Sequence, residues 1–392
     1  MNLFVLVWGY LKAKPLNTVL NILLLSLGIG VITTLMLFNN QFREKMSENS
    51  RGIDLVVGAK GSPLQLVLCS VFHIDFPTGN IKLRDAEALS KNRMVKKAIP
   101  MALGDSYQNV RIVGTDTSYT GLFDARLKDG SWWKEDLEVV AGATAAEALK
   151  LSIGDTFASA HGLTEDGHNH EENRYKVVGI LQPTHAVADN LLFTNISSVW
   201  KVHDIHAQSD SAKEITSLLI KYRNPIAALQ LPRMINSNTN MQAASPAFET
   251  ARLFSILGIG VDVLLGIAST IIIVSALSIF IALYNSLKER RYDMAIMRSM
   301  GAGRSRLFMA VVLEGITLTL IGSVVGILLG HLLILAFTTL VEEGARTGIS
   351  AMVFYTSEII LIAGSLLLGV ICSTIPAVQA YRTDIHKVLS GN

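Results

Sequence analysis

The chain has 392 residues, half of which are hydrophobic and only 17% of which are charged. Soluble domains carry about 25% charged residues, so this composition excludes an ordinary soluble protein and indicates a membrane protein. The net charge of +2 gives no reason to expect a nucleic-acid partner. Cys69 belongs to the more polar domain between the first two apolar stretches, whereas Cys372 lies inside an apolar run, so no disulfide between them is expected.

Four stretches are long and apolar enough to cross a bilayer, which takes about 20 predominantly apolar residues in a helix. They are residues 18–38, 253–284, 307–337 and 359–380. The first has neither the short core nor the small-residue cleavage site of a signal peptide, so we expect it to remain as an anchor. Short segments 1–17 and 381–392 flank the spans.

Basic residues are distributed unevenly between the connecting segments. The segment 285–306 contains Lys288, Arg290, Arg291, Arg298, Arg304 and Arg306, whereas the segment 338–358 contains Glu342, Glu343, Glu358 and Arg346. Because cytoplasmic loops are rich in Lys and Arg, 285–306 and both chain ends are expected in the cytoplasm, with 338–358 and the large segment 39–252 outside. The predicted location is a bacterial inner membrane, with 39–252 in the periplasm.

The segment 39–252 has the pattern of a mixed α and β domain. Apolar runs at 110–114, 138–142 and 175–181 end at turn residues and predict strands, while 85–92 and 144–151 have helical spacing. A segment of roughly 200 residues can bury its own core. The predicted fold class is therefore a membrane α-helical protein, with four transmembrane helices per protomer and an α+β periplasmic domain inserted between helices 1 and 2.

One apolar segment of this domain, residues 54–81, has two interpretations. The turn 58–63 precedes an apolar run at 64–72 and could be mistaken for a phosphate loop, but the required Gly-x-x-x-x-Gly-Lys-Ser/Thr spacing occurs nowhere in the chain. The segment is either a buried helix behind a turn or an apolar surface that meets a lipophilic cargo or a partner.

Histidines cluster in a second segment of the domain. His161, His168 and His170 alternate with carboxylates, and His185 follows. Imidazole and carboxylate groups at this density could bind zinc, the one cofactor considered for this chain itself. Flanking Gly and Asn residues favour a solvated polar hairpin instead. No Ser-His-Asp or Cys-His spacing indicates a catalytic nucleophile, so no enzyme activity is expected.

The third span contains a regular series of glycines, Gly315, Gly322, Gly326 and Gly330. The last three are spaced by four and line one helix face, where small residues allow a second helix to approach closely. The contact is expected within the protomer or across a dimer; the alternative is that glycine is simply common in membrane helices. The ionisable residues of the spans, Asp262, Glu314 and His331, lie near span ends, which favours anchoring or helix–helix bonding over a proton pathway.

Residues 287–300 in the basic loop have the pattern of an amphipathic helix. Its apolar positions are Leu287, Met294, Met297 and Met300, and Gly301 is expected to end it. Such a helix either lies on anionic lipid headgroups or docks into a groove of a cytoplasmic protein.

Residues 288–302, KERRYDMAIMRSMGA, resemble the "ERRREIALLRALGA" signature of FtsX-like ABC permeases. That family includes macrolide exporters, lipoprotein-releasing permeases and a cell-division permease. Glu314 and the glycines at 315–330 are similar to its third helix, and residues 376–382 resemble its C-terminal motif, in which Ile385 replaces the usual proline. Residues 139–181 are similar to the MacB-like periplasmic core domain.

The resemblance implies a permease that works as a homodimer or heterodimer, each copy bound to a separate ABC ATPase that holds ATP and Mg²⁺. By analogy the coupling contact comprises Glu289, Arg290, Arg291, Asp293, Met297, Arg298 and Gly301. Membrane lipids and a periplasmic adaptor or binding protein are further candidate partners. Since this chain has no phosphate loop, the ATPase activity is expected on the partner subunit.

Three functions fit these features. The first is export or extraction of a lipophilic substrate or a lipoprotein from the periplasmic side, driven by mechanical transmission from the ATPase. The second is a signalling scaffold that uses ATP to regulate a periplasmic partner such as a cell-wall hydrolase. The third is metal-linked transport through the histidine-rich segment.

Overall fold

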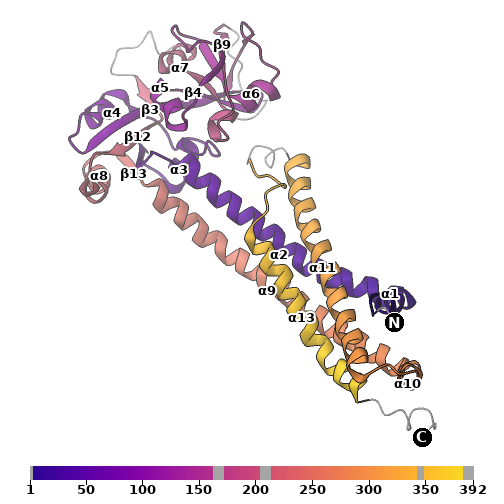
Figure 1. Ribbon diagram of the computed structural model, residues 1–392. Coiled ribbons are helices and arrows are strands. Elements are labelled where there is room, and N and C mark those ends of the chain that lie inside the picture. The colour runs from indigo at the N-terminus through magenta and orange to yellow at the C-terminus, as the bar shows by residue number, and fades with distance from the viewer. Residues whose placement is uncertain (1–2, 162–171, 204–212, 342–347, 383–392) are drawn as a thin grey trace. The chain divides into compact units, whose positions relative to one another are not determined.

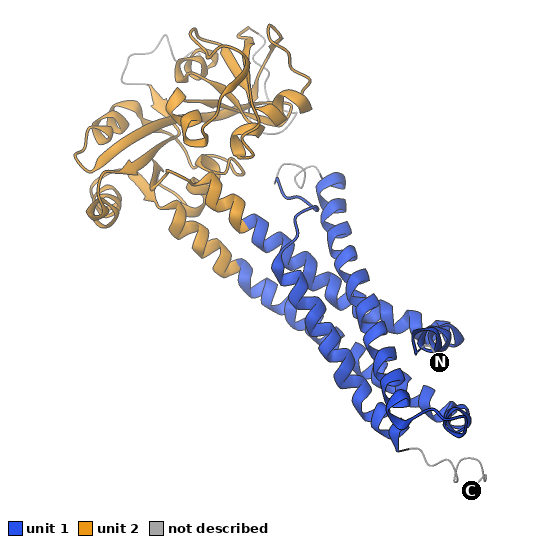
Figure 2. Ribbon diagram, in the orientation of Figure 1, with its two compact units in different colours: residues 1–42, 257–392 blue, residues 43–256 orange. Residues whose placement is uncertain are grey.

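The computed structural model describes residues 3–161, 172–203, 213–341 and 348–382. The chain divides into two compact units, which Figure 2 shows in different colours. The helical unit comprises residues 1–42 and 257–392, and the α+β unit comprises residues 43–256. Among the described residues, four helices are long and apolar enough to cross a membrane. The predicted fold class is confirmed.

The helices of the helical unit are longer and more numerous than the four predicted spans (Figure 1). They are α1 (Leu3–Ala13), α2 (Pro15–Asn49), α9 (Pro246–Glu289), α10 (Arg291–Ser299), α11 (Arg304–Leu340) and α13 (Thr356–Tyr381). The short helix α1 occupies most of a segment for which the sequence predicted no helix. Pro15 begins the next helix, as expected for a residue that lacks an N–H and has a helical φ.

The helices α2 and α9 contain the junctions between the two units, at 42/43 and 256/257. With 35 and 44 residues they are about 52 and 66 Å long at 1.5 Å per residue, against about 30 Å of hydrocarbon. Polar residues after Phe38 end the apolar run, but neither Gly nor Pro occurs between residues 31 and 51 to end the helix. Hydropathy therefore locates the end of a membrane span and not the end of its helix.

Apolar packing holds the helical unit together. One buried cluster joins α1, α2, α9 and α11 through Val7, Leu11, Leu25, Ile29, Ile279, Leu283, Leu318 and Ile327. The helices α11 and α13 pack closely against each other. The hairpin around α10 has a separate core of its own.

The α+β unit contains a large mixed sheet. Its strand order is β13-β1-β12-β3-β4-β10-β6-β9-β5, with β7 on β9 and β8 on β3, while β2 and β11 pair separately. The strands are β1 (Leu55–Ala59), β2 (Ile81–Lys82), β3 (Val95–Tyr107), β4 (Val110–Gly114), β5 (Leu127–Gly130), β6 (Glu138–Ala141), β7 (Thr156–Phe157), β8 (Ala160–His161), β9 (Tyr175–Leu181), β10 (Leu192–Thr194), β11 (Glu214–Ile215), β12 (Ser217–Tyr222) and β13 (Met241–Ala244). Its helices are α3 (Pro63–Ser70), α4 (Leu83–Ser90), α5 (Thr117–Thr120), α6 (Ala143–Ala148), α7 (Ile196–Val202) and α8 (Pro225–Asn238).

The long strand β3 belongs to both halves of this sheet. It pairs with β12 on one side and β4 on the other, and its register with β4 shifts between Leu103 and Ser106, around Gly104 with φ +156°. Two hydrophobic cores result: one beneath β1, β12 and β13 against α4 and α8, the other beneath β4, β6 and β9 against α6. The pairs β4–β10 and β6–β9 are parallel and the others antiparallel.

The apolar segment 54–81 contains both features that its sequence suggested. Pro63 begins α3, whose N-cap Ser62 accepts a hydrogen bond from the Gln65 amide, and the helix buries Leu66 and Val67. Beyond α3, the side chains of Ile74 and Phe76 are 60% and 51% exposed. The helix is therefore part of the core, as are Val71 and Phe72 directly after it, whereas Ile74 and Phe76 form a small exposed apolar surface.

Candidate functional site

The hairpin that connects α9 to α11 packs one side of α10 into the helical unit. Met294 and Ala295 are buried, and Met294 packs with Leu287, Leu307 and Val311. Gly301, with φ +95°, ends the helix: the Ala302 amide bonds the Met297 carbonyl and the Gly301 amide the Arg298 carbonyl. This is the hydrogen-bond pattern of a Schellman cap, which favours glycine at the left-handed position.

Arg290, at the N-terminal end of α10, points into the helical unit. Its Nη1 lies 3.5 Å from Oε2 of Glu314 on α11, and its Nη2 donates to the Tyr10 carbonyl of α1 at 3.3 Å. The guanidinium also lies 3.7 Å from the centre of the Tyr10 ring. The side chains of Arg290 and Glu314 are only 13% and 10% exposed. A planar guanidinium can bond a carboxylate and stack on an aromatic ring at once, so Arg290 joins three helices.

A small pocket lies beside this ion pair, between α1, α9, α10 and α11. Its lining is mostly apolar, with Tyr10, Arg290, Glu314 and Ser286 as the polar groups. Met297, predicted as part of the ATPase contact, is half-buried and lines the same pocket. Arg298, also half-buried, is in the last turn of α10, where its charge complements the helix dipole.

The opposite side of α10 is exposed and partly apolar. Tyr292, Ile296 and Met300 are 58%, 36% and 76% exposed. Their spacing of four places them on one helix face, which we call the exposed stripe. The predicted apolar stripe is thus divided, because Leu287 and Met294 are buried inside the unit and Met300 faces out.

The charged residues predicted for the coupling contact also divide between the two sides. Arg291 and Asp293 are exposed beside the stripe, as is Gly301. Glu289 is exposed as well and forms an ion pair with Lys14. Arg290 bonds the Glu314 carboxylate inside the helical unit and so fixes the hairpin.

The glycines of α11 lie against two different helices. Added Cβ atoms at Gly322, Gly326 and Gly330 would come within 2.8, 2.8 and 2.6 Å of side-chain atoms of α2. We call these three residues the glycine seam. Gly315 faces α13, where its Cβ would lie 2.9 Å from the Gly369 carbonyl oxygen. All of these close approaches are within one protomer, the first of the two arrangements that the sequence left open.

The ionisable residues of the spans are placed differently from one another. His331 is 8% exposed, with Nδ1 2.6 Å from the Ala351 carbonyl oxygen and Nε2 3.1 Å from Glu358 Oε2. Glu358 also accepts a bond from the Tyr355 amide and so caps α13. Asp262 is exposed on α9. Glu314 and His331 therefore both serve helix–helix bonding.

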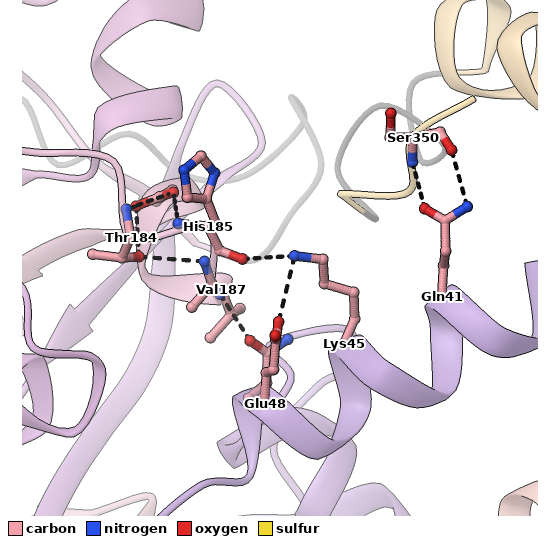
Figure 3. Close-up of polar contacts among 10 residues, drawn as sticks. Gln41, Lys45, Glu48, Thr184, His185, Val187 and Ser350 are labelled. Atoms are coloured by element: carbon pink, nitrogen blue, oxygen red, sulfur yellow. Dashed lines mark hydrogen bonds and ion pairs between the residues drawn. The ribbon is translucent and has the colours of Figure 1, made fainter. Parts of the chain in front are cut away.

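Polar side chains follow one face of α2 near its C-terminal end (Figure 3). Within the helical unit, the Gln41 amide exchanges two hydrogen bonds with the main chain of Ser350, at 2.9 and 2.8 Å. Within the α+β unit, Lys45 donates to the His185 carbonyl at 2.8 Å and Asn49 Oδ1 accepts from the Val187 amide at 3.0 Å. The spacing of Gln41, Lys45 and Asn49 by four gives one continuous polar face.

The turn that Lys45 and Asn49 contact is held by a buried carboxylate. Asp189, 6% exposed, accepts bonds from the main-chain amides of Thr184 and His185 and from the Thr184 hydroxyl, at 2.7–3.0 Å. His185 has a φ of +59°. This turn, residues 184–190, is thus held in shape by Asp189 and binds the C-terminal end of α2. No pattern in the sequence predicted this contact.

The predicted metal ligands lie mostly outside the described residues. His168 and His170 belong to the segment 162–171, and of His161 only the main chain, in β8, is described. His185 takes part through its main chain in the contact with Lys45. Across the part of the chain that the structure describes, no three His, Cys, Asp or Glu side chains are grouped to hold a metal ion.

Two half-buried histidines of the α+β unit have pKa values shifted in opposite directions. His73 Nε2 lies 2.8 Å from the Tyr119 hydroxyl, and burial, with the nearby Arg111 guanidinium, lowers the pKa of His73 to about 3. A hydrogen bond with Asp105, at 3.2 Å, raises the pKa of His203. Burial raises the pKa of the Cys69 thiol, which makes this cysteine a poor nucleophile.

Comparison with known families agrees with this architecture. The model of the FtsX-like permease C-terminal family matches residues 265–385, and that of the MacB-like periplasmic core domain matches residues 18–237. Together with the four apolar helices, these matches define a membrane protein with an extracellular domain, of the permease class. The chain belongs to the family of ABC transporter permeases that carry MacB-like and FtsX-like domains.

Individual relatives are distant. An uncharacterised ABC transporter permease of Methanocaldococcus jannaschii is 28% identical over 137 residues, 35% of this chain and 34% of the relative, so the match spans about a third of that protein. The periplasmic region of MacB from Actinobacillus actinomycetemcomitans is 15% identical with a TM-score of 0.35, over 53% of this chain and 97% of that one. The extracellular domain of YknZ, a noncanonic ABC-type transporter from Gram-positive bacteria, is 12% identical with a TM-score of 0.32, over 49% and 99%. The family models carry the assignment.

Proposed function

We propose that this chain is the permease through which a separate ABC ATPase moves the extracellular domain, in a bacterial inner membrane with the hairpin in the cytoplasm. The observation that carries the proposal is the two-sided α10. Its inner side is fixed by Arg290 and the core around Met294, and its outer side presents the exposed stripe between charged residues. A rigidly held helix with a free apolar face suits docking into a groove of a partner protein.

Contacts within each unit support a path for force from the hairpin. Arg290 ties α10 to α11 through Glu314, and the glycine seam packs α11 against α2. Beyond residue 42, α2 continues into the extracellular domain, where Lys45 and Asn49 bond the turn 184–190. Displacement of the hairpin would therefore be passed to α2 by packed helices, with no flexible linker between residues 15 and 49.

The cargo that we propose is lipophilic, either a lipid-like molecule or a lipoprotein. Its support is the apolar surface after α3, where Ile74 and Phe76 are 60% and 51% exposed on the extracellular domain. Exposed apolar patches mark interaction surfaces, so these two side chains favour an apolar occupant. A second copy of the permease and a periplasmic adaptor complete the proposed assembly.

Docking is tested by co-purification with an ABC ATPase, whose gene we expect beside that of this chain. We expect Ile296→Glu with Met300→Glu to reduce the recovered ATPase at least tenfold, because two charges would enter an apolar interface. Ile153→Glu is the matched control, since Ile153 is 49% exposed but lies in the extracellular domain. Undiminished ATPase recovery and full coupling in the double variant would contradict the docking assignment. Arg290 is unsuited to this test, because its substitution alters the hairpin itself.

The cargo is tested separately with a photo-crosslinking residue at position 76. We expect a lipid or lipoprotein adduct from Phe76 and none from a matched position at Ile226, which is 60% exposed on α8. Equal labelling at both positions, or adducts with a hydrolase alone, would refute the proposed cargo class without affecting the docking result.

A further inference from the structure

We infer that α1 is an interfacial helix that binds the lipid surface of the membrane on the side of the hairpin. The helix, LFVLVWGYLKA, has 11 residues. It rises about 16 Å, roughly half of the hydrocarbon thickness, so it cannot cross the bilayer. Its contact with the hairpin through Tyr10 and Arg290 places both on the same side of the membrane, whatever the orientation of the chain.

The helix α1 is apolar on two faces, and protein covers one of them. Val7 and Leu11 are 2% and 6% exposed and pack into the core of the helical unit. On the other face Phe4, Val5 and Trp8 are 70%, 68% and 52% exposed. Each large apolar side chain gains about 1.5–3 kcal/mol when it leaves water, so this second face requires an apolar surrounding. A helix that is apolar all round is found in a protein core or in a membrane.

The position of α1 in the chain and the charges near it indicate that lipid covers its exposed apolar face. Only Lys14 separates α1 from α2, which is long and apolar enough to cross the membrane. The Thr18 hydroxyl of α2 donates to the Leu11 carbonyl at 2.9 Å and so ties the end of α1 to the start of the span. The charges of this region are basic: Lys12, whose Nζ lies 5.6 Å from the Trp8 ring centre, and Lys14. Aromatic rings with neighbouring cations are the usual anchors at an anionic membrane surface.

Binding of α1 to the lipid surface would also fix the position of the hairpin relative to the membrane. Tyr10 lies between the two, since Arg290 at the start of α10 stacks on its ring and bonds its carbonyl. Lys14, directly after α1, forms an ion pair with Glu289, the residue before Arg290. The lipid-facing helix and the partner-facing helix are therefore joined through adjacent residues, Glu289 and Arg290. This inference holds whether or not α10 binds an ATPase.

The test uses tryptophan quenching in the full chain, reconstituted in nanodiscs of brominated phosphatidylcholine. The chain has four tryptophans, and the variant Trp132→Phe, Trp133→Phe, Trp200→Phe retains only Trp8. We expect Trp8 to lose more than half of its emission with bromines at acyl carbons 6 and 7, and less with bromines at carbons 11 and 12, because an interfacial helix lies about 5–10 Å into the boundary. The matched control, Trp8→Phe, retains the three tryptophans of the extracellular domain and should be quenched little.

Quenching of Trp8 no stronger than that of the domain tryptophans would overturn the inference and assign the apolar face to a protein contact such as a second copy. Stronger quenching by the deep bromines would overturn it too, since the helix would then be inserted among the spans. If the triple variant does not fold, the difference between the natural chain and Trp8→Phe gives the same Trp8 signal.

Discussion

Substitution of Gly326 by alanine tests how closely α11 and α2 must pack. A Cβ atom added at Gly326 would lie 2.8 Å from Ile29 Cβ and 2.9 Å from the Ser26 carbonyl oxygen. Neither contact is with the end of a flexible side chain, so a rotamer change cannot relieve the overlap. The two helices would have to separate along the whole glycine seam.

The magnitude follows from these distances. Carbon atoms in optimal contact are about 3.5–4.0 Å apart, so the new Cβ would be about 0.7–1.2 Å too close to Ile29. Overpacking of a well-packed interior costs about 1–3 kcal/mol. The unfolding equilibrium constant should therefore rise about 5- to 150-fold, since 1.36 kcal/mol corresponds to a factor of ten.

The assay is unfolding in mixed micelles as the fraction of denaturing detergent is raised. Gly364→Ala in α13 is the matched control, because a Cβ added there meets nothing within 4 Å. Alanine is the better helix former by about 1 kcal/mol, so the control should be unchanged or stabilised. If Gly326→Ala is as stable as Gly364→Ala, the glycines do not determine the contact between α11 and α2.

Four further predictions concern polar side chains inside the two units. Arg290→Ala should destabilise the helical unit by about 3–5 kcal/mol, because it leaves Glu314 buried without its ion-pair partner. In the same unfolding assay, the double variant Arg290→Ala, Glu314→Ala should lose much less stability than the sum of the two single variants. Simple additivity of the two losses would refute the pairing. In the natural chain, the lowered pKa of His73, about 3, means that the stability of the fold decreases below pH 6.5, by up to about 1.4 kcal/mol per pH unit as the pH drops toward 3. In His73→Phe this decrease should be absent, because phenylalanine does not bind a proton. His203→Gln should lower stability below pH 6.5, because the raised pKa of His203 gives stability that is fully present there and is lost as the pH rises through the folded pKa. The difference in stability between His203→Gln and the natural chain should therefore shrink above pH 6.5. Thermal unfolding of the full chain between pH 5 and 8 checks both histidine predictions. A cost of His203→Gln that grows with rising pH, or an effect of His73→Phe that is confined to pH values above 6.5, would contradict the corresponding assignment. Asp189→Ala should accelerate hydrogen exchange at the Thr184 and His185 amides, which lose their acceptor, while exchange in β9 stays unchanged. Equal exchange at these two amides in Asp189→Ala and in the natural chain would show that the carboxylate does not hold the turn.

The parts of the fold that could be predicted depend on local patterns. The strands predicted at 110–114 and 175–181 coincide with β4 and β9, because each is a short apolar run ended by a turn residue. The apolar spans are likewise contained in α2, α9, α11 and α13. The continuation of α2 to Asn49 could not be read from hydropathy, since polar residues such as Gln41 and Lys45 are compatible with a helix outside lipid.

The helix α1 shows a different limit of sequence reasoning. Its 11 residues are too few for a span, so a search for membrane helices passes over them. A signal was nevertheless available: Phe4, Val5, Val7, Trp8 and Leu11 give an apolar pattern on more than one face. Only the structure shows which of these residues pack against α11 and which are exposed.

The hairpin shows why a signature motif does not by itself separate residues that bind a partner from residues that hold the motif in shape. Arg290 and Arg291 are adjacent in sequence and identical in chemistry, but about 100° apart around a helix turn of 3.6 residues. Glu314, 24 positions from Arg290, together with Tyr10 at the other end of the helical unit's sequence, determines which arginine turns inward. A charge reversal at Arg290 would therefore deform the hairpin itself, and a loss of the proposed coupling in that variant would not identify a docking contact. The exposed stripe lacks charge and is less evident in the sequence, yet substitutions there test the proposed docking directly, because Arg290 and the buried core still hold α10 in place.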